Sequence, residues 1–341
     1  MAATDKAACE TLSTEITGRR AWRRDDIAAR DWTVSLSPEA IEELERVIVS
    51  LRLEPVPTLL LTPEDFELSA CARIMGGVSD QLRFGIGLVV LDAIPVERVT
   101  LDESRAITWL LGSLLGRVVP TKWDGTTLYD VRDTGRSLEY GVRRSVTNLD
   151  LTFHTDAAWM DRPPEMVGLT CVNPALEGGV SRFVSLSSVH NELRRRHPGL
   201  LPRLYRPFPW DRQAEHGPAA PKTTSRPIFQ LDPPRPGRAS AQGEEDRWMA
   251  CYNERLIQTG ASLIGDELDG EGQEALAAMD AVVNSPELWV ELVIQRGQVQ
   301  LLDNRHFAHS RTDFRDADDP NRKRHLIRFW TREEGRRAFH A

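Results

Sequence analysis

Residues 148–156 read NLDLTFHTD, a run in which polar and apolar side chains alternate before it ends in a histidine and a carboxylate. Such alternation is typical of a β-strand, in which successive side chains point to opposite faces. On an extended segment His154 and Asp156 point the same way, whereas on a helix they would lie about 200° apart. The stretch therefore predicts a strand that offers an imidazole and a carboxylate to one metal ion.

A second histidine–acid pair, His190 and Glu192, has the same spacing in a different setting. It falls within residues 188–196, which we predict to form a helix that ends before Pro198 and Gly199. On a helix the imidazole and the carboxylate diverge. We therefore interpret this pair as structural and expect the metal-binding pair at residues 154–156.

A third ligand has to come from another strand. The run QVQLLDN at residues 298–304 leads to His306 and His309, and either imidazole could serve. The sequence SRT at residues 310–312 resembles the start of an exposed active-site rim, which favours His309. Two imidazoles and one carboxylate are the ligand set of non-heme Fe(II) sites that keep open coordination positions.

The stretch RHLIRFW at residues 324–330 is strand-like by composition. Alternation places Arg324, Leu326, Arg328 and Trp330 on one face. One interpretation is an exposed edge strand with solvated arginines, because burying unpaired charges is costly. The other is anion recognition, since a guanidinium can bind a carboxylate through two hydrogen bonds. We favour anion recognition, which an enzyme with an anionic cosubstrate requires.

The remaining pattern predicts one domain, residues 31–341, after a loosely attached N-terminal arm, residues 1–30. Capped helices are expected to begin at Ser37 and at Thr100, the second ending at Gly116. Residues 207–247, rich in proline, arginine and acids, are predicted to be an insertion, either a surface loop or a lid over a site. Further strands are expected at residues 83–91, 128–131, 164–172, 180–186 and 288–302, and further helices at 188–196 and 273–283.

Composition argues against several classes of function. The chain has 341 residues, 40% of them hydrophobic, which suffices for a buried core. A net charge of -8 disfavours nucleic acid as a partner. The four cysteines are dispersed and residues 1–24 lack a signal-peptide pattern, which favours a cytoplasmic location. No apolar run is long enough to span a membrane. We expect a small-molecule substrate as the partner, and homo-oligomerisation stays open.

Together these segments resemble the taurine dioxygenase (TauD/TfdA) and clavaminate synthase-like group of Fe(II)/2-oxoglutarate oxygenases. The resemblance covers roughly residues 83–330 and rests on the order and spacing of short segments. It implies a mainly β fold with flanking helices, a double-stranded β-helix or jelly-roll barrel. The matching segments are FHTD (153–156), EGGVS (177–181), LDN (302–304) leading to HSRT (309–312), and RHLIR (324–328).

The resemblance also implies roles for particular residues. His154, Asp156 and His309 would be the iron ligands. Arg324 would bind the far carboxylate of 2-oxoglutarate, and Ser181 stands where the family usually places a threonine hydroxyl on that carboxylate. Two departures are Gln298, where relatives often have aspartate, and Ser310, where glycine is common. Neither removes a ligand.

The implied reaction uses O2 and 2-oxoglutarate, yields succinate and CO2, and oxidises an unactivated C–H bond. Halogenating relatives carry a small residue in place of the carboxylate, so Asp156 favours hydroxylation, with desaturation or cyclisation as alternatives. Two rival readings remain. One is a cupin-like Zn or Mn enzyme, and the other is a non-catalytic barrel that binds 2-oxoglutarate.

The substrate is predicted from the surroundings of the ligands. Asn148 and Asp150 share the face of His154 if that strand runs straight, and Asp150 could meet an amine. Trp159 could wall the pocket or simply pack in the core. By the resemblance, Arg328 would lie near the substrate or the inner carboxylate of 2-oxoglutarate. These residues suggest an amino-acid-like or carboxylate-bearing metabolite, such as a biosynthetic intermediate.

Overall fold

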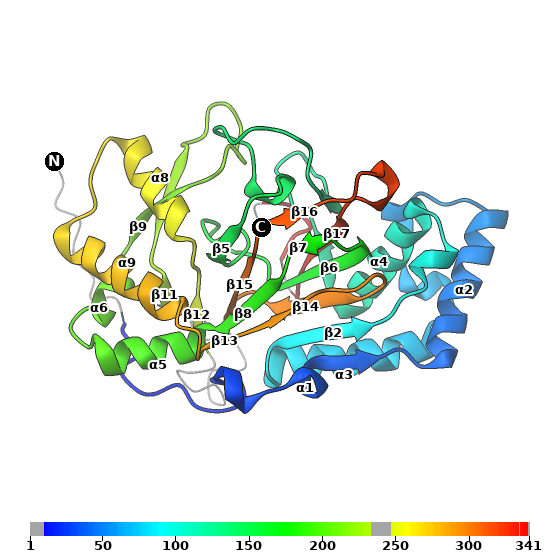
Figure 1. Cartoon of the computed structure of the whole chain (residues 1–341), viewed down its shortest axis with the longest axis horizontal. Coiled ribbons are helices and arrows are strands. Elements are labelled where there is room, and N and C mark those ends of the chain that lie inside the picture. The colour runs from blue at the N-terminus through cyan, green and yellow to red at the C-terminus, as the bar shows by residue number, and fades with distance from the viewer. Residues whose placement is uncertain (1–9, 233–246, 334, 340–341) are drawn as a thin grey trace.

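The computed structural model describes residues 10–232, 247–333 and 335–339, and it contains two main β-sheets flanked by helices (Figure 1). The larger sheet has the strand order β1–β2–β14–β6–β17–β3, with β4 beside β17. The smaller sheet has the order β13–β8–β15–β5. Apart from the parallel pair β1–β2, neighbouring strands in both sheets are antiparallel. The expectation of a mainly β fold with flanking helices is confirmed.

The elements have the following bounds. The larger sheet comprises β1 (Thr33–Ser35), β2 (Leu88–Asp92), β3 (Arg117–Val119), β4 (Tyr129–Val131), β6 (Met166–Asn173), β14 (Val299–Asp303) and β17 (His325–Arg332). The smaller sheet comprises β5 (Leu151–His154), β8 (Ser181–Ser185), β13 (Trp289–Leu292) and β15 (Phe307–Arg311). Short pairs are β7 (Glu177–Gly178) with β16 (Phe314–Arg315), β9 (Phe208–Asp211) with β10 (Thr223–Arg226), and β11 (Phe229–Leu231) with β12 (Trp248–Ala250). The α-helices are α1 (Ala29–Trp32), α2 (Pro38–Leu53), α3 (Ser69–Phe84), α4 (Leu101–Leu115), α5 (Leu186–Arg196), α6 (Leu201–Leu204), α8 (Glu254–Ile264) and α9 (Gly270–Val283). Single 3-10 turns are η1 (Arg24–Asp26), η2 (Thr58–Leu60), η3 (Pro63–Asp65), η4 (Val96–Arg98), η5 (Arg144–Val146) and η6 (Pro320–Arg322).

Helices α3 and α4 pack against the larger sheet, α2 packs against α3, and residues of all three helices belong to one hydrophobic core (Figure 1). Two of them begin where the sequence predicts. The Ser37 hydroxyl accepts a hydrogen bond from the Ala40 amide at the start of α2. Thr100 and Glu103 cap each other at the start of α4, which ends at Gly116. Both caps satisfy amides that a helix leaves unpaired.

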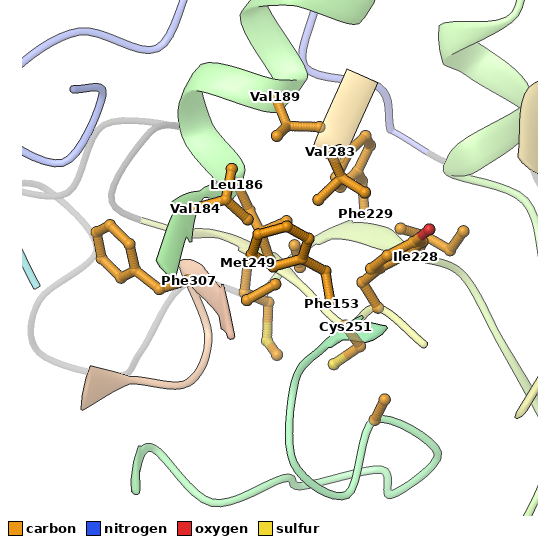
Figure 2. Close-up of a cluster of buried hydrophobic side chains, with 14 of the residues drawn as sticks. Phe153, Val184, Leu186, Val189, Ile228, Phe229, Met249, Cys251, Val283 and Phe307 are labelled. Carbon is orange, nitrogen blue, oxygen red and sulfur yellow. The ribbon is translucent and has the colours of Figure 1, made fainter. Parts of the chain in front are cut away.

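A second core lies between the smaller sheet and helices α5 and α9 (Figure 2). The cluster includes Phe153 of β5, Val184 of β8, Phe307 of β15, Phe229 of β11 and Val283 of α9. Burial of each such side chain contributes about 1.5–3 kcal/mol. Because β5 and β15 also carry the predicted ligands, this core fixes the backbone that holds them.

Two of the expected strands differ from the structure. Residues 83–91 were expected to be one strand, but α3 continues to Phe84 and β2 begins only at Leu88. The connection needs Gly87, which has φ +71 and lies so close to the Phe307 ring that a Cβ would be 1.9 Å from Cε2. Residues 288–302 form two strands rather than one, β13 in the smaller sheet and β14 in the larger. The chain crosses between the sheets at residues 293–298, where Gly297 has φ +83.

The N-terminal arm is not loosely attached from residue 10 onward; residues 1–9 lie outside the described part of the chain. Leu12, Ile16 and Trp22 are buried in the core beside the smaller sheet. The Ile16 amide donates to the Asn191 side chain of α5 at 2.9 Å. The arm is thus part of the packed structure, because its few apolar residues are spaced to reach that core.

The predicted insertion at residues 207–247 is structured where it is described. Its first part forms the β9–β10 hairpin, which packs against α8, and then β11, which pairs with β12. Residues 233–246 lie outside the described part of the chain. Within the described helices, none combines the length and apolar character that a membrane span needs. Cys71, Cys171 and Cys251 are free and buried, and Cys9 is not described.

Candidate metal centre and cosubstrate pocket

His154 and His309 are cross-strand neighbours in the smaller sheet. The strand register pairs His309 of β15 with His154 of β5, and the two ring centroids are 4.3 Å apart. Asp156 follows β5 by two residues, and its Oδ1 lies 3.6 Å from His154 Nε2. One ligand atom from each of the three lies within 4.8 Å of the others. The structure brings together the three residues that the sequence predicted to share an ion.

The charge state of these three residues suits a divalent metal ion. His154 Nδ1 donates to the Thr152 carbonyl at 2.9 Å, which leaves the Nε2 lone pair for a metal. Burial, together with the nearby His154, lowers the pKa of His309 to about 3. Burial alone would raise the pKa of Asp156, but Arg328 and the two histidines outweigh it and hold that pKa well below its usual range. Two imidazoles and one carboxylate fit Fe(II).

Asp156 is held in place from the larger sheet. Trp330 Nε1 donates to Oδ2 at 2.8 Å, and Arg328 Nη1 lies 3.2 Å from the same oxygen. The backbone of Asp156 is fixed by the Asn304 side chain, which accepts from its amide at 2.7 Å and donates to its carbonyl at 3.0 Å. The centre therefore lies between the two sheets. Asn304 was not predicted as a site residue, and its place in the LDN segment was the only signal.

His306 lies elsewhere and is already engaged. Its Nδ1 is 2.7 Å from Asp303 Oδ2, and its Nε2 is 2.9 Å from the Trp248 carbonyl. Neither ring nitrogen is available for a metal ion. The structure therefore agrees with the choice of His309, although one argument for that choice is wrong. Ser310 and Arg311 do not start an exposed rim, because β15 is an interior strand and both residues are buried.

The second histidine–acid pair has the structural role that the helix predicts. His190 is buried in α5, and its Nε2 is 2.9 Å from the Tyr205 hydroxyl. Glu192 points away from it and forms ion pairs with Arg23 and Arg195, each at 2.6 Å. The carboxylate and the imidazole diverge as expected for positions i and i+2 of a helix.

Arg324 has the features of an anion-binding residue. It directly precedes β17, is 4% exposed, and its Nη1 has no hydrogen-bond partner within the described residues. Burial lowers its pKa to about 10, so the guanidinium stays charged at neutral pH. Gly179, with φ +66, is its neighbour, since a Cβ there would be in van der Waals contact with Arg324 Nε at 3.4 Å. Ser181 is buried at the start of β8, two residues after Gly179. A buried cation with an unpaired donor fits the far carboxylate of 2-oxoglutarate.

Strand β17 is not an exposed edge strand. It lies between β6 and the strands β3 and β4, and all its residues are buried. Arg328 and Trp330 both contact Asp156, whereas Phe329 packs into the core under α4. The predicted alternation is therefore confirmed for these positions. Leu326 belongs to a separate small core with Val131.

The residues predicted to meet the substrate divide into two groups. Asn148 and Asp150 are exposed and do not share the face of His154, because β5 begins only at Leu151 and a bulge interrupts its register with β15. Asp150 instead pairs with Arg144 at 2.6 Å. By contrast, Trp159, 2% exposed and packed in the core, lines the cavity beside the metal centre. Arg328 lines the same cavity.

Two neighbouring cavities lead to the metal centre. The inner one, of about 60 Å³, is bounded by His154, Asp156 and Trp330. The outer one, of about 450 Å³, shares residues with it from three segments: the loop before β5, the β9–β10 hairpin and α8. Arg143, Gln213 and Asn253 line the inner cavity and were not predicted. They come from loops and a helix cap, where the sequence carries no periodic signal.

Two histidines and an aspartate converge between two sheets, and a buried arginine lies nearby. This combination is typical of a metal-dependent oxygenase of the double-stranded β-helix class. The family profile described as "Taurine catabolism dioxygenase TauD, TfdA family" matches residues 54–330. The chain belongs to this family, and the resemblance found in the sequence is confirmed.

Two characterised relatives match most of the chain. FR-33289 synthase of Streptomyces rubellomurinus is 26% identical and covers 97% of this chain and 94% of its own length. The taurine hydroxylase-like protein SAT17 of Stachybotrys chartarum is 22% identical, with 87% of this chain and 74% of its own length covered.

Solved structures of low sequence identity share the fold. An asparagine oxygenase, in complex with Fe(II), 2S,3S-3-hydroxyasparagine and succinate, superposes with a TM-score of 0.63 at 17% identity, over 88% of this chain and 93% of that one. The non-heme iron oxygenase OrfP, in complex with Fe and alpha-ketoglutaric acid, gives 0.61 at 17% identity, over 89% and 94%. The predicted fold class is confirmed. The predicted iron and 2-oxoglutarate are the ligands that the OrfP structure contains.

Proposed function

We propose that the chain is an Fe(II)- and 2-oxoglutarate-dependent oxygenase that hydroxylates an unactivated C–H bond of a small amino-acid-like or carboxylate-bearing metabolite. The observation that carries the proposal is the convergence of His154, Asp156 and His309 in a buried site. The buried, unpaired guanidinium of Arg324 supports it independently. In this proposal the three residues hold the metal ion, and Arg324 with Ser181 holds the far carboxylate of 2-oxoglutarate.

The chain's own residues position and shield the reacting groups. Fe(II) with 2-oxoglutarate, when bound, supplies the O2 activation that converts C–H to C–OH, with succinate and CO2 as coproducts. The Thr152 carbonyl fixes the tautomer of His154, and Trp330 and Arg328 fix the orientation of the Asp156 carboxylate. Trp159 closes one wall of the inner cavity and excludes water from it.

The two rival readings explain fewer of these features. A Zn or Mn cupin-like enzyme has no use for a buried guanidinium with an unpaired donor at Arg324. A non-catalytic barrel that binds 2-oxoglutarate has no use for a second cavity of about 450 Å³ beside the metal centre. An amino-acid-like substrate is supported by the hydroxylated amino acids in the asparagine oxygenase and OrfP structures.

A substrate screen that follows succinate tests the proposal. Purified protein with Fe(II), 2-oxoglutarate and ascorbate is offered amino acids, their acylated derivatives and small carboxylates. We expect at least one of these compounds to raise succinate formation above the uncoupled level and to gain one oxygen atom by mass spectrometry. Asp156→Ala should abolish both signals. Full turnover in Asp156→Ala would contradict the proposed metal site.

A further inference from the structure

The inner cavity holds a second buried guanidinium beside Arg328. Arg143 and Arg328 both line this cavity, with side chains 11% and 8% exposed. Both also lie against the ring of Tyr129, at 5.4 and 4.9 Å from its centroid. Two cations therefore share one small space next to the metal centre, and burial together with this proximity lowers the pKa of Arg143.

The two guanidinium groups have unused donors. Within the described residues, Nε and Nη2 of Arg328 and Nε of Arg143 are buried without a hydrogen-bond partner. Arg328 uses its Nη1 on Asp156, which is a proposed metal ligand. Arg143 uses its Nη2 on the Thr121 carbonyl at 3.1 Å and on Glu215 at 2.6 Å. Unpaired buried donors are costly, and an oxyanion in this cavity would satisfy them.

Glu215 reaches Arg143 from the predicted insertion. It lies in the turn of the β9–β10 hairpin, next to Gln213 and Ala214, which adopt positive φ angles of 54° and 59°. The Trp123 amide donates to its other carboxylate oxygen at 2.8 Å. The hairpin thus holds one carboxylate against Nη2 of one of the two cavity arginines and partly neutralises its charge, while Nε of that arginine stays without a partner among the described residues.

We propose that Arg143, together with Arg328, receives an oxyanion group of the substrate, and that Glu215 competes with this group for Arg143. This inference rests on the proposed function and deepens it, because it makes Arg143 and Glu215 the specificity-determining pair. The substrate's anionic group, a carboxylate or a tetrahedral oxyanion, lies in the inner cavity. The rest of the substrate extends into the outer cavity, whose wall includes Leu138 and Leu263.

The alternative is that the Arg143–Glu215 pair only ties the hairpin to the loop before β5. The two accounts differ in the sign of one effect. If Glu215 competes with an anion, Glu215→Gln tightens anion binding, because glutamine still accepts from Trp123 but no longer neutralises Arg143. If the ion pair only holds the hairpin against the loop, Glu215→Gln makes the loop less ordered and weakens any anion binding in the cavity.

Calorimetric titration of the metal-free full chain distinguishes these accounts. The probes are acetate, inorganic phosphate and methanesulfonate. All proteins carry Arg324→Gln, so that the probes do not bind at the proposed cosubstrate subsite. In this background Arg143→Gln should weaken binding of the preferred probe about ten-fold or more, and Glu215→Gln should strengthen it about three-fold. The matched control is Arg203→Gln, which removes a buried guanidinium that pairs with Asp269 and does not line the cavity.

The preferred probe identifies the oxyanion as planar or tetrahedral. Unchanged binding in Arg143→Gln, or weaker binding in Glu215→Gln, would overturn the proposal. If Arg143→Gln does not fold, Arg143→Lys, which keeps the charge but loses the planar donor pair, should bind more weakly than the parent, and equal binding would count against the proposal. None of these measurements needs iron. Failure of succinate formation with the predicted anion binding would therefore refute the proposed function and leave Arg143 as an anion-binding residue.

Discussion

His154 and His309 owe their proximity to one register pair between β5 and β15. A slip of one residue in either strand would turn its imidazole to the opposite face of the sheet. The apolar neighbours help to fix this register, because Phe153 is buried beside His154, and Phe307, two residues before His309, packs against Gly87 and Trp22. The chemistry of the centre thus depends on hydrophobic packing that contains no ligand.

Replacement of each candidate histidine should give opposite results. We expect His309→Ala to lose stoichiometric Fe(II) binding and all succinate formation, because two ligands remain. His306→Gln should keep Fe(II) binding but unfold at lower denaturant concentration, because it breaks a buried contact with Asp303. Metal content and urea unfolding check both. Loss of iron in His306→Gln with retention in His309→Ala would reverse the ligand assignment.

Arg324→Ala should raise the 2-oxoglutarate concentration needed for half-maximal succinate formation by about thirty-fold or more. The reason is that losing a buried charged hydrogen-bond partner costs about 2 kcal/mol or more. Ser181→Ala should have a smaller effect, a few-fold, because a neutral hydrogen bond contributes about 1 kcal/mol. Ser181→Thr keeps the hydroxyl and serves as the control. An unchanged requirement in Arg324→Ala would contradict the cosubstrate assignment.

The shared face of His154 and Asp156 could be predicted from the alternation of one strand, whereas the roles of Arg324 and Ser181 toward 2-oxoglutarate came from the family resemblance and stay predictions. Asn148 and Asp150 were misplaced because a bulge in β5 is not visible in that alternation. Arg143 and Gln213 were missed because their positions depend on loops that meet only in the folded chain.

At the level of elements, capped helices and buried strands were predicted better than the segments that join them. The caps at Ser37 and Thr100 are local hydrogen-bond patterns and can be read from a few residues. Helix α3 was missed, since its end at Phe84 runs directly into the apolar residues of β2. The break between β13 and β14 was missed because the two strands belong to different sheets, and the local sequence does not show which sheet a strand joins.

Helix α5 should make stability depend on pH through His190. Burial lowers the pKa of His190 to about 4. The unfolded chain takes up a proton below about 6.5, so stability is complete above that pH and declines as the pH falls toward 4. The expected loss between pH 7.5 and 4.5 is about 2 to 3 kcal/mol from this group.

Urea unfolding of His190→Gln at the two pH values tests this expectation. The variant should lose less stability on acidification than the unsubstituted protein. His197→Gln, at the end of the same helix, is the control and should keep the full pH dependence. Equal pH dependence in His190→Gln and the unsubstituted protein would show that His190 is not responsible.

At the scale of the whole molecule, the described part of the arm packs into the same core cluster as strands of the smaller sheet. The arm's Trp22 stacks on Phe307, with ring centroids 5.8 Å apart, and donates to the Ile86 carbonyl at 2.9 Å. Phe307 lies two residues before His309 on β15. The polar composition of residues 1–30 concealed this role, since only a few large apolar residues carry the packing.

Trp22→Ala should therefore destabilise the entire domain by about 3–5 kcal/mol, the usual cost of removing a buried aromatic side chain. Trp123→Ala removes a tryptophan that is 49% exposed and should cost much less. Chemical denaturation of both variants, followed by fluorescence and by circular dichroism, measures the difference. Equal stability of the two variants would contradict this expectation and support the prediction that the arm is loosely attached.

Anaerobic titration of the metal-free protein with Fe(II) and then 2-oxoglutarate tests the central claim most directly. The account predicts a visible charge-transfer absorption that saturates at a single iron per chain. It also predicts that Asp156→Ala and His309→Ala lack this absorption and that Arg324→Ala needs far more 2-oxoglutarate to develop it. Absence of the absorption in the unsubstituted protein, or its survival in Asp156→Ala, would contradict the account.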